Sequence, residues 1–458
     1  MPTHNQRPTG AGLKPNLLFV FGDQWRGQAF GYAGDPNART PRIDRFAAES
    51  VHFTNAIAST PVCSPWRATL MTGQYPLTHG VFVNDVPLNP KGVTLGESLA
   101  DTGYHMAWIG KWHIDGRGRS AFIPPERRMG FQFWRTMECT HDYLNSYYYA
   151  DTPEKLKWDG YDAEAQTREA QRFICDHDQE TPFALFLSWG PPHDPYDQVP
   201  AEYLRHFSEG RIQLRPNVPP AMAAQARKSL AGYYAHCLAL DTYFGDLLDT
   251  LQQRGLDQNT IVVFTSDHGD MHCSQGSPSR KQQPWEESIA VPLLIRHPAL
   301  RGKPSKISNV IESVDVMPTL LGLCGSRVPA GVQGRDLSGP FRGGRLPSDQ
   351  PALLSFHFPF HDWRRDRGGH EFRGLRSQRH TYVRDLNGPW LLYDNAADPY
   401  QITNLCGRAE VRGPQRELDA ELTRRLAAIG DEFLPGEEYL RRWGYELDPV
   451  TQDIPIRR

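Results

Sequence analysis

Short runs of mostly apolar residues recur along the chain, and polar residues follow each of them. The clearest runs cover residues 16–21, 104–109, 183–189, 260–265 and 290–295. Runs of this length without polar alternation predict strands that are buried on both faces, as in a parallel sheet covered by helices. In open α/β sheets, ligands bind at the carboxyl ends of the strands. The pattern therefore predicts an α/β fold whose site lies at that edge.

Helix-forming segments with one apolar face separate the predicted strands. Pro41 stands at the first helical position of one such segment, where its missing N–H costs nothing. Strands that alternate with helices predict a mostly parallel sheet with helices packed on it. The predicted helices cover residues 41–49, 95–102, 221–255 and 313–321.

The carboxyl-terminal quarter has a different pattern. Residues 338–350 are rich in Gly, Pro, Arg and Ser, which is typical of a linker. Short strand-like pieces follow, and Asp385-Leu-Asn-Gly388 between two of them is a hairpin signal. A helix is expected over residues 413–429. We therefore predict a catalytic domain over residues 1–345 and a small subdomain, with an antiparallel sheet and one helix, over residues 346–458.

Composition excludes several classes of protein. The chain has 458 residues and a net charge of −3, which gives no indication of nucleic-acid binding. It contains no apolar run of 18 residues, so no membrane-spanning helix is expected. The segment 1–14 lacks the apolar core of a signal peptide, which favours a cytoplasmic location. The seven scattered cysteines form no C-x-x-C pair, which argues against a disulfide framework or a structural zinc site.

One segment combines a cysteine with a helix start. Pro65 fits the first turn of a helix, so Cys63 would lie at its amino-terminus, where free N–H groups favour an anion. Arg67 lies one turn further along, and Gly73 is placed to end the helix. A lone cysteine in such a place is usually a core residue.

Other candidate residues follow the predicted strands. Each has an ordinary alternative, because aspartates cap turns, loop histidines are often exposed and loop lysines are usually solvated. These candidates are Asp23, Gln24, Lys111, His113, His193, Asp267, His268 and Lys281.

The motifs around these residues occur in the order of a known family. Cys63-Ser-Pro-Trp-Arg67 with Thr72-Gly73 resembles the C-x-P-x-R and T-G signature of the type I sulfatases. The run from Gly103 to His113 resembles their second signature, which ends in G-K-x-H. The resemblance extends from residue 16 to about residue 429. It implies an alkaline-phosphatase-like α/β sandwich with a carboxyl-terminal α+β subdomain.

The resemblance also implies an activity, the hydrolysis of a sulfate monoester. In this family a formylglycine-generating enzyme oxidises the cysteine, here Cys63, to formylglycine. One hydroxyl of the hydrated aldehyde attacks sulfur, and the other collapses back to the aldehyde and expels sulfate. A plain serine or cysteine would remain sulfated.

By the same resemblance, each candidate residue receives a role. Asp23, Gln24, Asp267, His268 and the modified Cys63 would bind one divalent cation. The mostly oxygen shell suits Ca²⁺ or Mg²⁺, and the nitrogen ligand leaves Mn²⁺ open. Lys111, His113, His193 and Lys281 would gather with Arg67 around the sulfate; His113 would assist the nucleophile and His193 would protonate the leaving oxygen.

The expected substrate is a small sulfate ester, either a sulfated sugar or an aryl sulfate. Mixed aromatic and polar side chains suit a polyol ring better than a plain aryl group. The predicted pocket residues are Trp25, Trp66, Asn84, Asp85, His141, Asp142 and His361. Two alternatives stay open: a phosphonate monoester or phosphodiester hydrolase of the same superfamily, and a non-catalytic binder of sulfated ligands.

Overall fold

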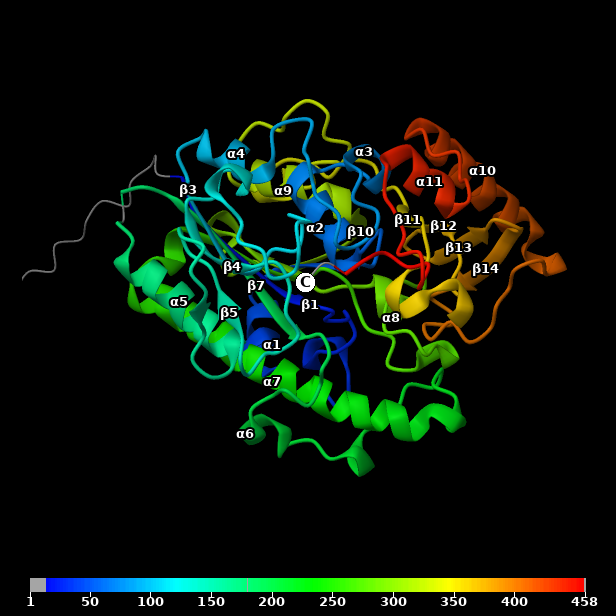
Figure 1. Ribbon diagram of the computed structural model, residues 1–458, viewed down its shortest axis with the longest axis horizontal. Helices are drawn as coiled ribbons and strands as arrows, with labels where there is room; N and C mark the ends of the chain where they lie inside the picture. The colour runs from blue at the N-terminus through cyan, green and yellow to red at the C-terminus, as the bar shows by residue number, and fades with distance from the viewer. Residues whose placement is uncertain (1–13, 179, 457–458) are drawn as a thin grey trace, which may run out of the picture.

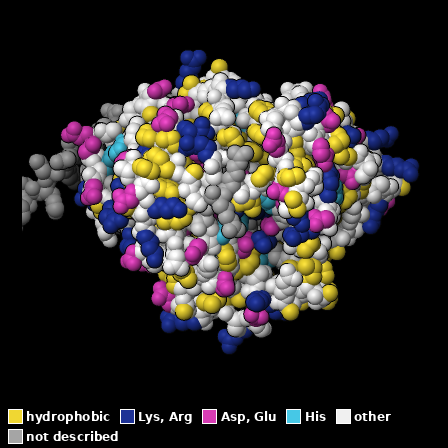
Figure 2. Space-filling model, viewed as in Figure 1, with side chains coloured by type: hydrophobic (Ala, Val, Ile, Leu, Met, Phe, Trp, Pro, Cys, Tyr) yellow, Lys and Arg dark blue, Asp and Glu magenta, His cyan; other side chains and the backbone are white. Residues whose placement is uncertain are grey.

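The computed structural model describes residues 14–178 and 180–456. The start of the chain, where the sequence predicts no leader peptide, lies outside the described residues up to position 13. Among the helices that are described, none has both the length and the apolar character that crossing a membrane requires. Acidic and basic side chains are interspersed over the face shown in Figure 2, in keeping with the small net charge.

An eight-stranded sheet occupies the centre of the molecule, with strand order β10-β2-β9-β8-β1-β7-β3-β4 (Figure 1). Only β9 among these strands runs antiparallel to its neighbours, which confirms the prediction of a mostly parallel sheet. The strands are β1 (Asn16–Asp23), β2 (Val51–Ile57), β3 (His105–Lys111), β4 (Phe133–Met137), β7 (Phe183–Pro192), β8 (Thr260–Ser266), β9 (Leu293–Arg296) and β10 (Ser305–Glu312).

Helices cover both faces of this sheet (Figure 1). Alternate residues of β1 face opposite layers: Phe19 packs in the core under α2, α4 and α9, whereas Val20 packs in the core under α1, α5 and α7. Both faces are buried, which is why the strand reads as an unbroken apolar run. The helices are α1 (Pro41–Ala47), α2 (Cys63–Thr72), α4 (Leu95–Ala100), α5 (Asp162–Asp176), α7 (Ala223–Gln253) and α9 (Ser313–Leu323).

A second, four-stranded sheet follows in the chain, and its strands are all antiparallel, as predicted. The helix predicted over residues 413–429 is present as α10 (Arg412–Ala428). The expectation of one helix is corrected by a second one, α11 (Gly436–Trp443), which also packs beside this sheet. The predicted hairpin joins β13 to β14. The boundary after residue 345 stays a prediction. The strands are β11 (Ala352–Phe356), β12 (Phe372–Arg376), β13 (His380–Asp385) and β14 (Gly388–Asp394).

Buried polar contacts join the two sheets. The Arg425 guanidinium on α10 donates to Glu312 at the end of β10 over 2.8 Å. The side chain of Gln282 donates to the carbonyl of Phe360 and accepts from the backbone N–H of Trp363, each over 3.1 Å. These last contacts join the loop after β11 to the loop that follows β8, so that the part of the chain around the second sheet contributes side chains to the site described next.

Candidate active site

Cys63 begins helix α2, as the sequence predicts. The preceding Val62 is extended, and Gly73 ends the helix in the left-handed conformation with φ 62°. The backbone N–H of Ser64, one of the free donors at the helix start, donates to Asn84 Oδ1 over 3.0 Å. Every residue of α2 is buried, and Cys63 is 1% exposed. The helix therefore presents its first side chain to an enclosed site.

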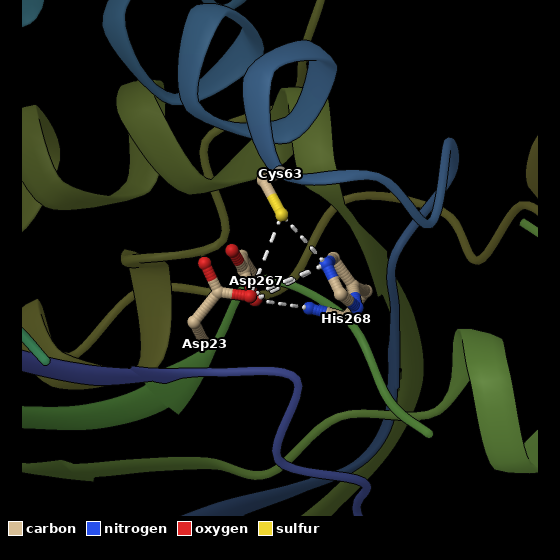
Figure 3. A group of neighbouring side chains, drawn as sticks. All are labelled: Asp23, Cys63, Asp267 and His268. Atoms are coloured by element: carbon tan, nitrogen blue, oxygen red, sulfur yellow. Dashed lines mark hydrogen bonds and ion pairs between the residues drawn. The ribbon is translucent and has the colours of Figure 1, made fainter. Parts of the chain in front are cut away.

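Two adjacent strands bring acidic residues to Cys63. Asp23 ends β1, and Asp267 and His268 directly follow β8. The ligand atoms of these three residues and Cys63 all lie within 4.8 Å of one another (Figure 3). Cys63 Sγ is 3.4 Å from Asp23 Oδ1 and 3.3 Å from His268 Nε2.

The donor set fits a hard divalent cation. Gln24 lies beside the cluster, and its backbone N–H donates to Asp267 Oδ1 over 2.9 Å. Its side-chain Oε1 is buried and has no hydrogen-bond partner among the described residues. Two carboxylates, one free amide oxygen and one imidazole make a shell of mostly oxygen donors, the type that Ca²⁺ and Mg²⁺ prefer.

Two buried basic side chains, Lys111 and Arg67, hold the carboxylates in place. Lys111 Nζ donates to Asp23 Oδ2 over 2.6 Å, and Arg67 contacts Asp23 and Asp267 at 3.2 Å and 3.3 Å. Burial alone would raise the pKa of Asp23, but Lys111, His193 and Arg67 bring it below its ordinary value. The Arg67 guanidinium is engaged by these carboxylates and is not among the residues that line the cavity, so its expected contact with the sulfate stays a prediction.

The other side of Cys63 carries cationic and imidazole groups. Lys281 Nζ lies 3.2 Å from Cys63 Sγ and 2.8 Å from His193 Nε2. His193 Nδ1 lies 2.8 Å from the carbonyl oxygen of Asp194, which orients the ring. Burial of the Cys63 thiol would raise its pKa, but the charges of Lys111 and Lys281 lower it well below the ordinary value. Cys63 thus lies between a site for a cation and a site for an anion.

His113 is held by an acidic partner. Its Nε2 lies 3.3 Å from Asp85 Oδ1, and Arg119 pairs with the same carboxylate over 2.7 Å. Burial would lower the pKa of His113, but the negative charge carried by a deprotonated Cys139 sulfur and the hydrogen bond to Asp85 raise it to about 9. His113 therefore carries a positive charge at neutral pH.

A cavity of about 150 Å³ opens beside Cys63. Of the predicted pocket residues, Asn84, His141 and His361 line it, whereas Asp85 acts behind His113. The predictions for Trp25, Trp66 and Asp142 are wrong. Trp25 stacks on Phe30 and Trp66 packs against Phe21, both in the core, whereas Asp142 is exposed away from the cavity. The two indole rings are largely apolar, so they pack into the adjacent hydrophobic cores and not into the polar cavity.

Sequence reasoning missed six residues that line the cavity. Four of them directly adjoin a predicted residue in the chain, and this adjacency could have identified them: Asp194, Arg280, Gln282 and Asp362. The others come from loops without a recognisable pattern. The six are Arg119, Asp194, Arg280, Gln282, Asp362 and Ile456.

Unusual backbone conformations gather around the cavity. Gln24, Asp85, His113 and His361 have φ of 70°, 62°, 60° and 50°. A residue other than glycine in this region costs on the order of 1–3 kcal/mol, so the surrounding packing must impose it. These residues are placed by the tertiary structure and not by their local preference.

Comparisons with known proteins agree with this geometry. The family model Sulfatase matches residues 15–326, and that of the N-sulphoglucosamine sulphohydrolase C-terminal region matches residues 280–428. An ulvan-active sulfatase of Formosa agariphila is 42% identical over 449 residues, 96% of this chain and 87% of that protein. An endo-4-O-sulfatase of Bacteroides thetaiotaomicron is 30% identical over 450 residues, 85% of this chain and 88% of that protein.

A solved structure from work on glycosaminoglycan metabolism in Bacteroides thetaiotaomicron has a TM-score of 0.83 and 28% identity, covering 97% of this chain and 100% of that one. The relatives at 42% and 30% identity are named as sulfatases, which favours sulfate over phosphonate esters and an enzyme over a binding protein. With its signature cysteine at the start of α2 and the matching fold around it, the chain belongs to the sulfatase family of sulfuric ester hydrolases.

Proposed function

We propose that this enzyme removes the sulfate group from a sulfated sugar, with Cys63 converted to formylglycine. The observation that carries the proposal is the place of Cys63, between the carboxylates at one sheet edge and Lys281 on the other side. The relatives whose names state a substrate or linkage, ulvan-active and endo-4-O sulfatases, support a sulfated carbohydrate.

Membership of the family implies a divalent metal and a formylglycine. We assign the metal to Asp23, Gln24, Asp267, His268 and the modified Cys63. We propose Ca²⁺ as this metal, with Mg²⁺ or Mn²⁺ as alternatives, because the mostly oxygen donors suit a hard cation. When bound, this cation supplies a Lewis acid that polarises a sulfate oxygen.

The remaining roles belong to side chains of the cavity. Lys111 and Lys281 would bind the sulfate oxygens, because both line the cavity beside Cys63. Lys281 Nζ lies 3.2 Å from Cys63 Sγ, and Lys111 Nζ also pairs with Asp23. His113, charged at neutral pH, would hold the nucleophile by a charge-assisted hydrogen bond. His193, whose ring is fixed through Nδ1, would hold the proton for the leaving oxygen at Nε2.

A maturation enzyme is required by this proposal. Cys63 is 1% exposed and lies at the start of a helix that is buried on all sides. A modifying enzyme cannot reach that thiol in the folded protein. We therefore propose that a formylglycine-generating enzyme acts on the Cys63 segment before the chain folds.

Peptide mass analysis of the Cys63 segment, combined with a panel of sulfate esters, tests the proposal. Cys63→Ala should abolish turnover and leave the fold intact, since one small side chain is removed. Cys324→Ala is the matched control, because Cys324 is also buried but lies in the core away from the site. Wild-type turnover by Cys63→Ala would refute the mechanism.

A further inference from the structure

A larger groove adjoins the catalytic cavity. Its volume is about 690 Å³, compared with about 150 Å³ for the cavity beside Cys63. Asp194 and Arg280 line both spaces, so the groove and the cavity lie on either side of this pair of residues. Clefts that enclose a drug-sized ligand measure roughly 300–1,000 Å³, a range that includes the groove but not the cavity. A sugar whose sulfate lies in the cavity must therefore extend outward.

Arg280 marks the junction of the two spaces. Its guanidinium lies 3.0 Å from Asp194 Oδ2 and 3.3 Å from Asp362 Oδ2, and its side chain is 40% exposed. The charge of the arginine is thus balanced by two carboxylates. A paired arginine and carboxylate can still donate and accept hydrogen bonds, as sugar hydroxyl groups require. Because the arginine charge is already balanced, the rim does not form a second binding site for an anion such as sulfate.

The walls of the groove are preformed, because contacts within the protein hold them in place. They are formed by the loop after β7, by α6 (Ala201–Leu204) and by α7, which contact one another (Figure 1). The Tyr196 hydroxyl donates to Asp270 over 2.6 Å, and the Phe207 ring stacks on Tyr234 with centroids 6.0 Å apart. A Cβ at Gly232 would lie 2.1 Å from the carbonyl oxygen of Tyr196, so only glycine lets the loop lie directly on α7.

The lining combines aromatic faces with polar edges. Tyr196, Phe207 and Leu204 supply apolar surface, and Gln225 and Lys228 on α7 supply hydrogen-bond donors. A pyranose ring has the complementary character, with C–H faces and hydroxyl edges. Rigid walls also reduce the entropy cost of binding.

We propose that this groove binds the sugar residues attached to the sulfated one, so that the enzyme prefers sulfated oligosaccharides to sulfated monosaccharides. The inference rests on the proposed function, because the groove can act only on a substrate whose sulfate occupies the neighbouring cavity. It assigns the loop after β7, together with α6 and α7, to recognition of the glycan chain.

The test compares a sulfated monosaccharide with an oligosaccharide that carries the same sulfated residue. Gln225→Trp places a large side chain in the groove, and Ala224→Trp is the control, because Ala224 is exposed on α7 but does not line the groove. Gln225→Trp should lower kcat/KM for the oligosaccharide about tenfold or more, mainly through KM. Gln225→Trp should change kcat/KM for the monosaccharide only slightly. Ala224→Trp should change kcat/KM only slightly for either sugar.

Other outcomes separate the two proposals. If the wild-type enzyme turns over both sugars with equal kcat/KM, the groove assignment is wrong and the proposed function stands. If neither sugar is turned over while an apolar aryl sulfate is, the proposed sugar substrate is wrong. Lys228→Ala, which only shortens an exposed side chain, provides a second variant with an intact fold and should also weaken the oligosaccharide selectively.

Discussion

Gln24 Nε2 donates to Asp270 Oδ2 over 2.6 Å, and this contact determines which end of the amide faces the metal-binding residues. The same carboxylate oxygen accepts from the Tyr196 hydroxyl over 2.6 Å. Because a carboxylate can only accept, the NH₂ group of Gln24 must point toward it. Oε1 is thereby directed away and left free as a ligand.

Asp270→Asn should therefore weaken metal binding. The new amide can satisfy either end of the Gln24 amide, so the orientation of Oε1 is no longer imposed. Loss of such an outer contact typically costs about 10–100-fold in metal affinity. Competition with a chelator gives the Kd, and Asp366→Asn, at an exposed aspartate, is the control. An unchanged Kd would show that Asp270 has no part in orienting the ligand.

Arg67→Ala should destabilise the fold strongly. It leaves Asp23 and Asp267 buried without their shared partner, and removal of one member of a buried ion pair costs about 3–5 kcal/mol. An added divalent cation should recover part of this loss, because it balances the same carboxylates. Denaturant unfolding with and without the cation measures both effects.

The control for this experiment is Arg168→Ala, which breaks an exposed pair with Glu164 on α5. Such surface pairs contribute about 0–1 kcal/mol. A loss for Arg67→Ala as small as that of the control would contradict the assignment of Arg67 as the support of the two carboxylates.

His193→Ala should separate substrates by their leaving groups. An alcohol leaving from a sugar sulfate needs a proton, and removal of a general acid costs roughly 10²–10⁴-fold in rate. A nitrophenyl sulfate leaves as a stable anion and should lose much less. The two kcat values are compared with those of His206→Ala, at an exposed histidine. Equal losses on both esters would mean that His193 does not protonate the leaving oxygen.

Asp162→Asn should stabilise the protein increasingly as pH rises. Asp162 begins α5, and its burial raises the carboxyl pKa from 3.8 to about 8. The folded state then binds this proton more tightly than the unfolded state, so wild-type stability falls as pH rises from about 4 to about 8. Asparagine keeps the shape of the neutral acid and does not ionise.

The measurement is the difference in Tm between this variant and the wild type at pH 5 and at pH 8.5. The gain should be larger at the higher pH and should level off above about pH 8. Asp101→Asn, at an exposed position, should show no such trend. A gain that is independent of pH would contradict a protonated Asp162 in the folded state.

Much of the site could be predicted from the chain because it depends on backbone direction. Parallel strands end at the same edge, so Asp23, Lys111, His193 and Asp267 meet there once the strands are recognised. The placement of Cys63 also follows from local rules, since Pro65 and Gly73 mark the two ends of its helix.

Prediction from local sequence patterns failed in two situations. One is a helix or strand that has few apolar residues, and the other is a side chain whose direction depends on how its helix packs. Helix α5 was missed because polar residues such as Asp162 and Gln166 share its buried face with Phe173 and Ile174. Trp66 was assigned to the pocket because it neighbours Cys63, but α2 is buried on every side and turns that ring into the core.

Local patterns in the sequence were enough to identify the buried strands, the helix that begins at Cys63 and the polar residues at the sheet edge, because these depend on neighbours within a few residues. Which distant loops complete the site depends on tertiary packing. His361 and Asp362 reach the cavity because Gln282, in the loop before α8 (Glu286–Ile289), bonds to the backbone on either side of them, about eighty positions along the chain. The direction of Arg67 and the groove along α7 have the same origin: they depend on which surfaces pack together, and no local pattern encodes that choice.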